Sequence, residues 1–404
     1  MAVNLTEPDQ LLAVPGVRIG TACAGIKQNQ RDDVAVFELA QGSETAGVFT
    51  RSHFSAAPVQ LARKRAHAAR AWVVNSGNAN AATGMPGIAD AQEVCAHAGQ
   101  LLQISPEHIQ PFSTGVIGER LPVEKLKSAL DVACAGLDEH GWLAAAKAIM
   151  TTDTCVKGRS RQIDIDGHLV TVTGIAKGSG MIKPNMATML AYLACDAPVA
   201  PGLAQKLVSA AVENSFNRVT VDGDTSTNDS FVLACTGTSS LPMIGSQSEA
   251  AYQMLSASIN EVAVFLAQAL VRDGEGATKF VTVHVTGGRT TSDCLNVAYT
   301  VAESPLVKTA MFAGDANWGR FCMAIGRAPV DGLRPDKVQL WLDKVRVAED
   351  GLMSPGYSEA QGAAVLAQDE FTVTIDLGLG NAQETVWTTD LSYEYVRINA
   401  EYRS

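Results

Sequence analysis

The chain has 404 residues with a formal net charge of −11, and 47% of its residues are hydrophobic. This size and composition suit two or three domains with substantial cores, and the acidic balance argues against a nucleic-acid-binding protein. No uninterrupted apolar run of about 18 residues is present, and residues 1–15 lack the basic head and apolar core of a secretory signal, so we expect a cytoplasmic protein with no membrane span.

Short strands alternate with helices over the first hundred residues. The buried strand expected over 71–75 leads through a loop of small polar residues, Ser76 to Gly84, into a helix. Strand-to-helix loops of this kind often shape binding sites, and an ordinary turn is the alternative interpretation. The other expected elements are a strand pair over 16–27, strands over 34–38 and 45–50, and helices over 58–70 and 88–102.

A second loop of small polar residues has the sequence Ser113-Thr114-Gly115-Val116-Ile117-Gly118. Glycines allow backbone N–H groups to point into one cavity, where they can stabilise an oxyanion. A plain turn is the simpler interpretation. Helices are then expected over 123–137 and 141–150, and the second ends at Thr151-Thr152-Asp153-Thr154, a cluster typical of a helix cap. Alternation over 162–173 around Asp166-Gly167 predicts a β-hairpin.

The chain is organised around the stretch from Lys177 to Leu190. It begins as a glycine-rich loop, reaches Ala187 and Thr188, and continues into an apolar strand expected over 189–195. If the Ala187–Thr188 peptide bond were cut, Thr188 would carry an α-amine with a pKa of ~8 beside its own hydroxyl. Such an amine is a suitable general base for a threonine nucleophile. A glycine loop that simply enters a strand is the alternative interpretation.

Metal binding is not expected. Asp222, Asp224 and Asp229 lie in an acidic loop after a strand expected from Arg218, but the ligand order of a calcium loop is missing. The seven histidines lack metal-ligand spacing. The eight cysteines include no CxxC pair and are typical of buried thiols in a reducing compartment.

The second half of the chain contains a predicted domain boundary near Lys279, where the composition changes. Before it, Glu275 lies between two glycines in the loop after a long helix, for which Ser246 and Glu249 form a capping box. The tail from 390 to 404 is not low-complexity. The expected elements are helices over 201–214 and 246–271, strands over 280–285, 338–345 and 371–377, and a helix from Pro305.

The string from Lys177 to Leu190 resembles the self-cleavage signature of the ornithine acetyltransferase family, the bifunctional glutamate N-acetyltransferases of arginine biosynthesis. The resemblance extends over essentially all 404 residues. It implies an α+β fold, a layered helix–sheet–sheet–helix arrangement of the self-cleaving aminopeptidase-like type, with a smaller C-terminal α/β domain. The corresponding domains are 1–279, which carries the nucleophile, and 280–404, whose tail returns to the active site.

The resemblance also implies the roles of individual residues. Thr188 is the expected nucleophile, and Thr114 and Gly115 form the expected oxyanion hole. Cleavage between Ala187 and Thr188 would give an alpha chain, 1–187, and a beta chain, 188–404, assembled as a heterotetramer of two of each. The residues expected to bind substrate are Thr151 or Thr152, between which the sequence does not choose, Lys177, Thr188, Glu275, Asn399 and Ser404.

The implied reaction is acetyl transfer in two halves. N-acetylornithine donates its acetyl group to Thr188, and glutamate then takes it and leaves as N-acetylglutamate. No bound cofactor and no metal are implied, although bifunctional members of the family also accept the acetyl group from acetyl-CoA. Two alternatives from other classes are an N-terminal-nucleophile aminopeptidase or amidase, which would pass the acyl group to water, and a non-catalytic binding protein that keeps the fold.

Overall fold

The computed structural model describes residues 2–27, 30–183 and 189–401. The chain divides into two compact units. We call Glu7–Asn217 with Thr225–Leu270 the large unit, and Met1–Thr6, Arg218–Asp224 and Val271–Ser404 the small unit. The division into domains 1–279 and 280–404 stays a prediction.

The large unit contains two β-sheets. Its strands are β1 Val17–Ala22, β2 Val34–Leu39, β3 Glu44–Phe49, β4 Ala71–Asn78, β5 Ile109–Val116, β6 Lys157–Ile165, β7 His168–Lys177, β8 Leu190–Cys195 and β9 Ser230–Cys235. One sheet has the order β1-β2-β4-β5 and the other the order β3-β9-β8-β7-β6. In the first, β4 and β5 are parallel, and in the second, β8 and β9 are parallel, so both sheets are mixed.

The two sheets face each other across an aromatic core. Strand β2 shows how the sequence builds it, because Phe37 packs inward against Trp72 and Tyr192 while Val34 and Val36 pack outward beneath helices. Side chains of successive strand residues point to opposite faces, and this strand is buried on both. Strand β2 therefore appears in the sequence as a nearly continuous apolar run, as does the fully buried β8, whereas the more exposed β6 is mostly polar.

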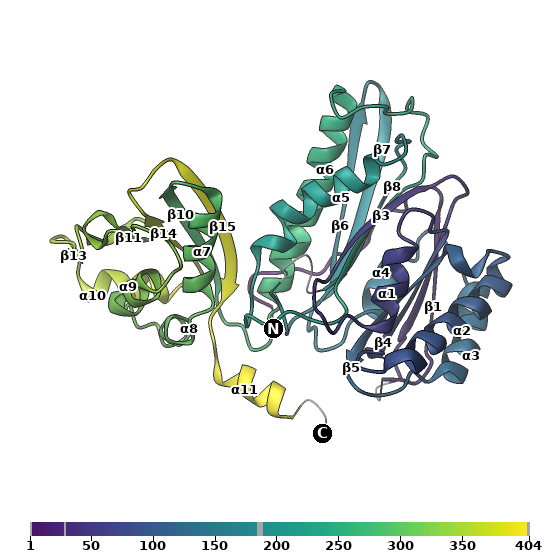
Figure 1. Cartoon of the computed structure of the whole chain (residues 1–404), viewed down its shortest axis with the longest axis horizontal. Helices are drawn as coiled ribbons and strands as arrows, with labels where there is room; N and C mark the ends of the chain where they lie inside the picture. Colours follow the sequence, from purple (N-terminus) through teal and green to yellow (C-terminus); the bar gives the residue numbers. More distant parts are fainter. Residues whose placement is uncertain (1, 28–29, 184–188, 402–404) are drawn as a thin grey trace. The chain divides into compact units, whose positions relative to one another are not determined.

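Helices cover both outer faces of the paired sheets. Helices α2 (Gly84–Leu102) and α3 (Val123–Ala135) pack on the sheet that contains β2. Helices α5 (Leu203–Asn214) and α6 (Ala250–Arg272) cover the other sheet, as Figure 1 shows. The shorter α1 (Ala57–Lys64) and α4 (Trp142–Ala148) contribute side chains to the central core. The predicted α+β fold with helix–sheet–sheet–helix layers is confirmed.

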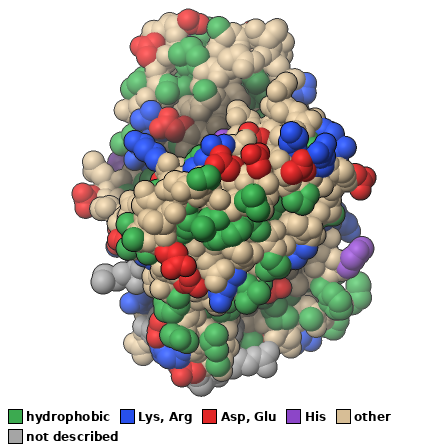
Figure 2. All heavy atoms as spheres, turned by 90° about the vertical axis from the view of Figure 1, so that its left-hand side faces the viewer, with side chains coloured by type: hydrophobic (Ala, Val, Ile, Leu, Met, Phe, Trp, Pro, Cys, Tyr) green, Lys and Arg blue, Asp and Glu red, His purple; other side chains and the backbone are tan. Residues whose placement is uncertain are grey.

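The small unit is built on a mixed sheet of order β13-β12-β11-β14-β10-β15. Its strands and helices are β10 Phe280–Gly288, α7 Thr291–Ala302, α8 Pro305–Ala313, α9 Trp318–Gly326, β11 Gln339–Leu342, β12 Val345–Glu349, β13 Leu352–Met353, α10 Glu359–Leu366, β14 Glu370–Asp376, β15 Ala382–Thr389 and α11 Tyr393–Ala400. Strand β10 pairs in parallel with β14 and antiparallel with β15. On the face of the molecule in Figure 2, acidic and basic side chains are interspersed between separate hydrophobic patches.

The structure corrects several predicted elements of the large unit. Residues 16–27 form the single strand β1 and not a strand pair, because the backbone N–H groups of Ala24 and Ile26 instead bind the buried Asp33 carboxylate. The long helix begins at Ala250, and Glu249 accepts a hydrogen bond from the Gly245 amide instead of closing a capping box on Ser246.

Two further corrections concern strands. No strand follows Arg218 in this described segment, where a 3-10 helix, Phe216–Arg218, is followed by an isolated bridge from Val219 to Trp387. The strand expected over 338–345 is divided into β11 and β12 by a turn at Asp343, whose φ is +49°. In contrast, the hairpin predicted around Asp166-Gly167 is confirmed, with φ values of +53° at Asp166 and +82° at Gly167.

Helix α6 is the one helix in the described part of the chain that is long and apolar enough to cross a membrane. In the structure 56% of its most apolar window is buried. Leu266 of this helix lies against Gly174 of β7, and Phe265 lies beneath the guanidinium of Arg159. These contacts are those of a helix that packs on a sheet.

Candidate active site

Three of the predicted site residues lie together in the large unit. Lys177 is the last residue of β7, and its Nζ donates to Thr151 Oγ1 at 2.8 Å and to Thr114 Oγ1 at 3.3 Å. Thr114 belongs to β5 in the opposite sheet, and Thr151 follows α4. The lysine side chain thus crosses from one sheet of the layered core to the other, and only 8% of its surface is exposed.

A buried carboxylate, which the sequence did not single out, supports this lysine. Asp153 Oδ1 accepts hydrogen bonds from Lys157 Nζ at 2.6 Å and from the Gly178 amide at 2.7 Å. Its Oδ2 accepts from the Thr151 amide at 3.0 Å and lies 4.0 Å from Lys177 Nζ. One carboxylate therefore joins the end of α4, the β6 lysine and the start of the glycine-rich loop.

The charge of Asp153 is strongly stabilised. Burial by itself would raise the pKa of this carboxyl, but the charges of Lys157 and Lys177 and the hydrogen bonds from Lys157 and Gly178 outweigh that effect. The pKa of Asp153 is held well below its usual range. A buried charge is tolerated when it is paired and hydrogen-bonded in this way.

The two candidate threonines after α4 occupy different places. Thr151 Oγ1 accepts from Lys177, whereas Thr152 Oγ1 is 2.7 Å from the hydroxyl oxygen of Ser179 in the glycine-rich loop. Thr151 is therefore part of the lysine cluster. Thr152 instead contacts the loop that leads toward the expected cleavage site.

Thr114 and Gly115 belong to strand β5 and do not form the plain turn that was the simpler interpretation. Gly115 pairs with Gly77 of β4, and the register shifts at the next residue. Its φ is +133°, and a Cβ there would lie 2.2 Å from the Gly77 carbonyl carbon. Only glycine fits this close approach of two backbones.

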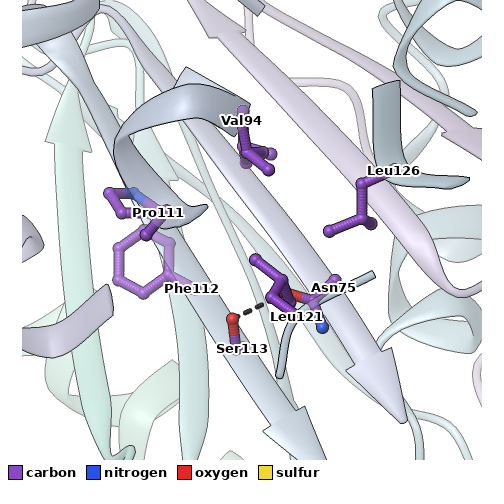
Figure 3. Close-up of a pocket in the computed structure, with 9 residues that line it drawn as sticks. Asn75, Val94, Pro111, Phe112, Ser113, Leu121 and Leu126 are labelled. Carbon is purple, nitrogen blue, oxygen red and sulfur yellow. Dashed lines mark hydrogen bonds between the residues drawn. The ribbon is translucent and has the colours of Figure 1, made fainter. Parts of the chain in front are cut away.

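A small pocket lies behind this strand. It is lined mainly by apolar side chains of β4, β5, α2 and α3, including Val94, Phe112 and Leu126 (Figure 3). Its polar lining residues, Asn75 and Ser113, bind each other, since Ser113 Oγ donates to Asn75 Oδ1 at 2.6 Å. Because its polar groups already bind each other, we interpret the pocket as a gap in the packing behind the site and not as a binding site.

The small unit carries a second cluster of predicted residues. Asn399 of α11 donates from Nδ2 to Glu275 Oε2 at 2.8 Å. Ser392 Oγ donates to the Gly276 carbonyl at 2.6 Å, and a Cβ on Gly276 would lie 2.5 Å from the Tyr395 amide nitrogen. The helix near the C-terminus is thus packed tightly against the loop that carries Glu275.

This second cluster is acidic. The hydroxyl of Tyr395 donates to Asp222 Oδ2 at 3.2 Å. Burial, then the charge of Asp222, its hydrogen bond and the charge of Glu275 raise the pKa of Tyr395 far above its ordinary value. The tyrosine hydroxyl therefore stays protonated beside these carboxylates. Among the described residues, no group of three or more His, Cys, Asp or Glu side chains is arranged to hold a metal ion.

Three predicted residues lie outside the part of the chain that the structure describes: Ala187, Thr188 and Ser404. The residues on either side of the expected cleavage site are described. Thr225 Oγ1 donates to the Lys183 carbonyl at 2.9 Å, and the Ser230 amide donates to the Met189 carbonyl at 2.8 Å.

Comparisons with known proteins identify the family of this chain. The model of the ArgJ family matches residues 18–404. The arginine biosynthesis bifunctional protein ArgJ of Pseudomonas fluorescens (strain Pf0-1) is 53% identical over 100% of both chains. The chain belongs to the ArgJ family. This membership confirms the family that the sequence predicted.

Two solved structures of relatives are also similar. The arginine biosynthesis bifunctional protein ArgJ of Bacillus halodurans is 35% identical, covers 51% of this chain and 96% of its own, and has a TM-score of 0.49. The ornithine acetyltransferase of Mycobacterium tuberculosis, solved with ornithine, is 31% identical, covers 45% of this chain and 96% of its own, and has a TM-score of 0.38.

Sequence reasoning missed residues that hold this candidate site together. Asp153 was interpreted only as part of a helix cap, and Asn228, whose side chain binds the Ser113 carbonyl, was not singled out. The available signal for Asp153 was its charge, since it is the one charged residue in a small polar cluster after an apolar helix. For Asn228 the sequence offers no signal beyond its place in a hydroxyl-rich loop.

Proposed function

We propose that this chain transfers the acetyl group of N-acetylornithine to glutamate, through an acetyl-Thr188 intermediate, in arginine biosynthesis. The observation that carries the proposal is the buried cluster of Lys177, Thr114 and Thr151 around Asp153, at the start of the self-cleavage signature. Membership of the ArgJ family and 53% identity to a bifunctional relative support it.

Self-cleavage creates the nucleophile in this proposal. Thr188 Oγ attacks the Ala187 carbonyl, the peptide C–N bond breaks, and water hydrolyses the resulting ester to leave the Ala187 carboxylate and the Thr188 α-amine. The free amine, with a pKa of ~8, then serves as general base for the same hydroxyl. The products are the alpha chain, 1–187, and the beta chain, 188–404.

Acetyl transfer then proceeds in two balanced steps. Thr188 Oγ attacks the acetyl carbonyl of N-acetylornithine, and ornithine leaves as the amine after accepting a proton. The amine of glutamate next attacks the acetyl ester and releases the Thr188 hydroxyl. Both tetrahedral intermediates carry an oxyanion, for which Thr114 and Gly115 are the proposed stabilising groups.

The proposed substrate contacts pair each charged group of the substrate with side chains of opposite charge. The ammonium group of Lys177 suits the carboxylate that N-acetylornithine and glutamate share, and Thr151 adds a hydroxyl beside it. Glu275 and Asn399, which bind each other, lie near Asp222 in an acidic cluster that suits the distal amine of ornithine. Ser404 and Thr152 complete the set of proposed substrate ligands.

The finer properties are part of the same proposal. Acetyl-CoA serves as a second acetyl donor, since the 53% identical relative is named bifunctional. The chain has a nucleophile-bearing domain, 1–279, and a C-terminal domain, 280–404. Two alpha chains, 1–187, and two beta chains, 188–404, form a heterotetramer in the cytoplasm. The chemistry itself uses no bound cofactor and no metal.

One assay tests the proposal. The purified protein is incubated with N-acetylornithine, with and without glutamate, and products are identified by mass spectrometry. Formation of N-acetylglutamate together with ornithine is expected. Release of acetate in both samples would indicate an N-terminal-nucleophile hydrolase instead, and an unchanged substrate would indicate a non-catalytic protein.

A further inference from the structure

The segment from Thr225 to Ser230 contacts the chain on both sides of the expected cleavage site. Its first residue holds Lys183, through the 2.9 Å hydrogen bond from Thr225 Oγ1 and a bridge between Ile182 and Thr225. Its last residue holds Met189, whose carbonyl accepts from the Ser230 amide at 2.8 Å. Met189 directly follows Thr188 in the sequence.

Asn228 joins this segment to strand β5. Its Nδ2 donates to the Ser113 carbonyl at 2.8 Å and to the Ala79 carbonyl at 2.6 Å, and its Oδ1 accepts from Thr227 Oγ1 at 2.6 Å. Both amide N–H groups are therefore used on backbone carbonyls. Only 6% of the residue is exposed, so these bonds form away from water and are costly to lose.

The end of β5 that receives these bonds carries the proposed oxyanion hole. Ser113 immediately precedes Thr114 and Gly115. It is held at two atoms, its carbonyl by Asn228 and its hydroxyl by Asn75 (Figure 3). The Ala79 amide binds the Val116 carbonyl at 2.9 Å on the far side of the glycine. Ser113 precedes Gly115 in β5, and Ala79 binds the residue that follows Gly115. Asn228 bonds to both, so it links the backbone around Gly115 to the segment that holds Met189.

We propose that Asn228 is a positioning residue, which sets the distance between the oxyanion strand and the Met189 end of β8 for acyl transfer. The inference rests on the proposed function, because it assumes that Thr188 attacks and that Thr114 and Gly115 receive the oxyanion. Stabilisation of an oxyanion requires donors within about 2.7–3.1 Å of its position. A small shift of β5 relative to β8 therefore lowers the rate of the chemical step.

The decisive variant is Asn228→Asp, which keeps the shape of the side chain. Its carboxylate faces the Ser113 and Ala79 carbonyls, so two attractive contacts become repulsive and the strand end shifts. We expect kcat for acetyl transfer to fall on the order of 100-fold, as for a misplacement of about 1 Å. The KM for N-acetylornithine stays close to the wild-type value because Asn228 is not a substrate ligand.

Thr45→Val is the matched control. Thr45 is also buried in the large unit, where its Oγ1 donates to the Ala66 carbonyl at 2.8 Å and accepts from the Ala69 amide at 3.1 Å. The valine variant loses buried hydrogen bonds of the same kind, but those bonds join Thr45 to Ala66 and Ala69 and not to β5. It should lose thermal stability but retain kcat.

The experiment uses the full chain and measures self-cleavage on gels, thermal unfolding, and steady-state kinetics with N-acetylornithine and glutamate. Asn228→Ala is measured in parallel and decides the outcome if the aspartate variant does not fold. A fall in kcat alone, in cleaved protein, supports the inference. A kcat equal to that of Thr45→Val, or a folded variant that stays uncut, overturns it. Absence of transfer by the wild-type protein would instead refute the proposed function.

Discussion

Lys177 Nζ lies 4.0 Å from Asp153 Oδ2, and Lys157 Nζ lies 2.6 Å from the other oxygen of the same carboxylate. The side chains of Asp153 and Lys157 are completely buried. Because the carboxylate also accepts from the Gly178 and Thr151 amides, it fixes the backbone next to Lys177 and the backbone of the threonine to which Lys177 donates. This arrangement fixes the position of Lys177, the proposed partner of the substrate carboxylate.

Replacement of Asp153 by asparagine should strongly destabilise the large unit. The variant leaves Lys157 buried beside a neutral amide, and removal of one partner of a buried ion pair typically costs about 3–5 kcal/mol. Denaturant unfolding measures the change. Asp131→Asn is the control, since its exposed pairing with His97 should contribute less than about 1 kcal/mol. Equal effects of the two substitutions would contradict this account.

The wild type and Asp153→Asn also test how stability depends on pH. The pKa of Asp153 is lowered in the folded state, so its stabilising effect is fully present above the ordinary aspartate value of ~3.9 and is lost as the pH falls through the folded-state value. The difference in unfolding free energy between wild type and Asp153→Asn should be constant near neutral pH and shrink in acid. A difference that grows in acid would contradict the assignment.

Lys308 in the small unit should also make stability rise with pH, but over the alkaline range. Burial lowers its pKa to about 8, against the charges of Asp390, Asp222 and Glu303, while its Nζ donates to Thr388 Oγ1 at 3.1 Å. Between about pH 8 and the ordinary value of ~10.4, the unfolded chain holds a proton that the folded chain has lost, so stability rises with pH.

The variant Lys308→Met lacks this titration. The unfolding free energy of the wild type, measured relative to that of the variant, should therefore increase from pH 8 to pH 10. Denaturant unfolding of both proteins at several pH values provides the measurement. A relative stability that is constant or that falls over this range would show that the pKa of Lys308 is not lowered.

Gly115→Ala should reduce kcat on the order of 100-fold to 1,000-fold, the range for loss of one oxyanion donor. The added Cβ would lie 2.2 Å from the Gly77 carbonyl carbon, so one of the paired strands must move. Gly118→Ala is the matched control, because Gly118 also has a positive φ, +91°, but its Cβ would meet no atom within 4 Å. If both variants lose the same activity, backbone strain and not the close approach is responsible.

Asn399→Ala should raise the KM for N-acetylornithine while self-cleavage stays intact. The substitution removes the partner of Glu275 and one proposed ligand, and an unpaired polar group in a closed site costs about 1–3 kcal/mol. Asn296→Ala, which removes an exposed hydrogen bond to the Pro329 carbonyl, is the control. An unchanged KM would exclude Asn399 as a ligand.

Local signals in the sequence were sufficient for some elements and not for others. The hairpin at Asp166-Gly167 was predicted because turn chemistry is local. Residues 23–27 were not, because their backbone binds Asp33, a contact that a strand pattern does not encode. Helix α11 has exposed Tyr393 and Val396 and little apolar periodicity, so its docking on the Gly276 loop is a tertiary effect.

The candidate site divides in the same way. The motif around Lys177 and the family resemblance pointed to residues that the proposed chemistry requires, and their roles stay predictions. The residues that hold them in place could not be predicted, since Asp153 meets Lys177 and Asn228 meets Ser113 only after the sheets pack together. Residues that hold others in place depend on the distances between helices and strands, and a short motif does not specify those distances.

The central claim is that Thr188 becomes an N-terminal nucleophile that carries the acetyl group. Its most direct test is mass spectrometry of the purified protein after a brief incubation with N-acetylornithine without glutamate. We expect two chains, 1–187 and 188–404, with a single acetyl group on the peptide that begins at Thr188 and none after glutamate is added. An intact chain that is fully active, or an acetyl group on another residue, would contradict the account.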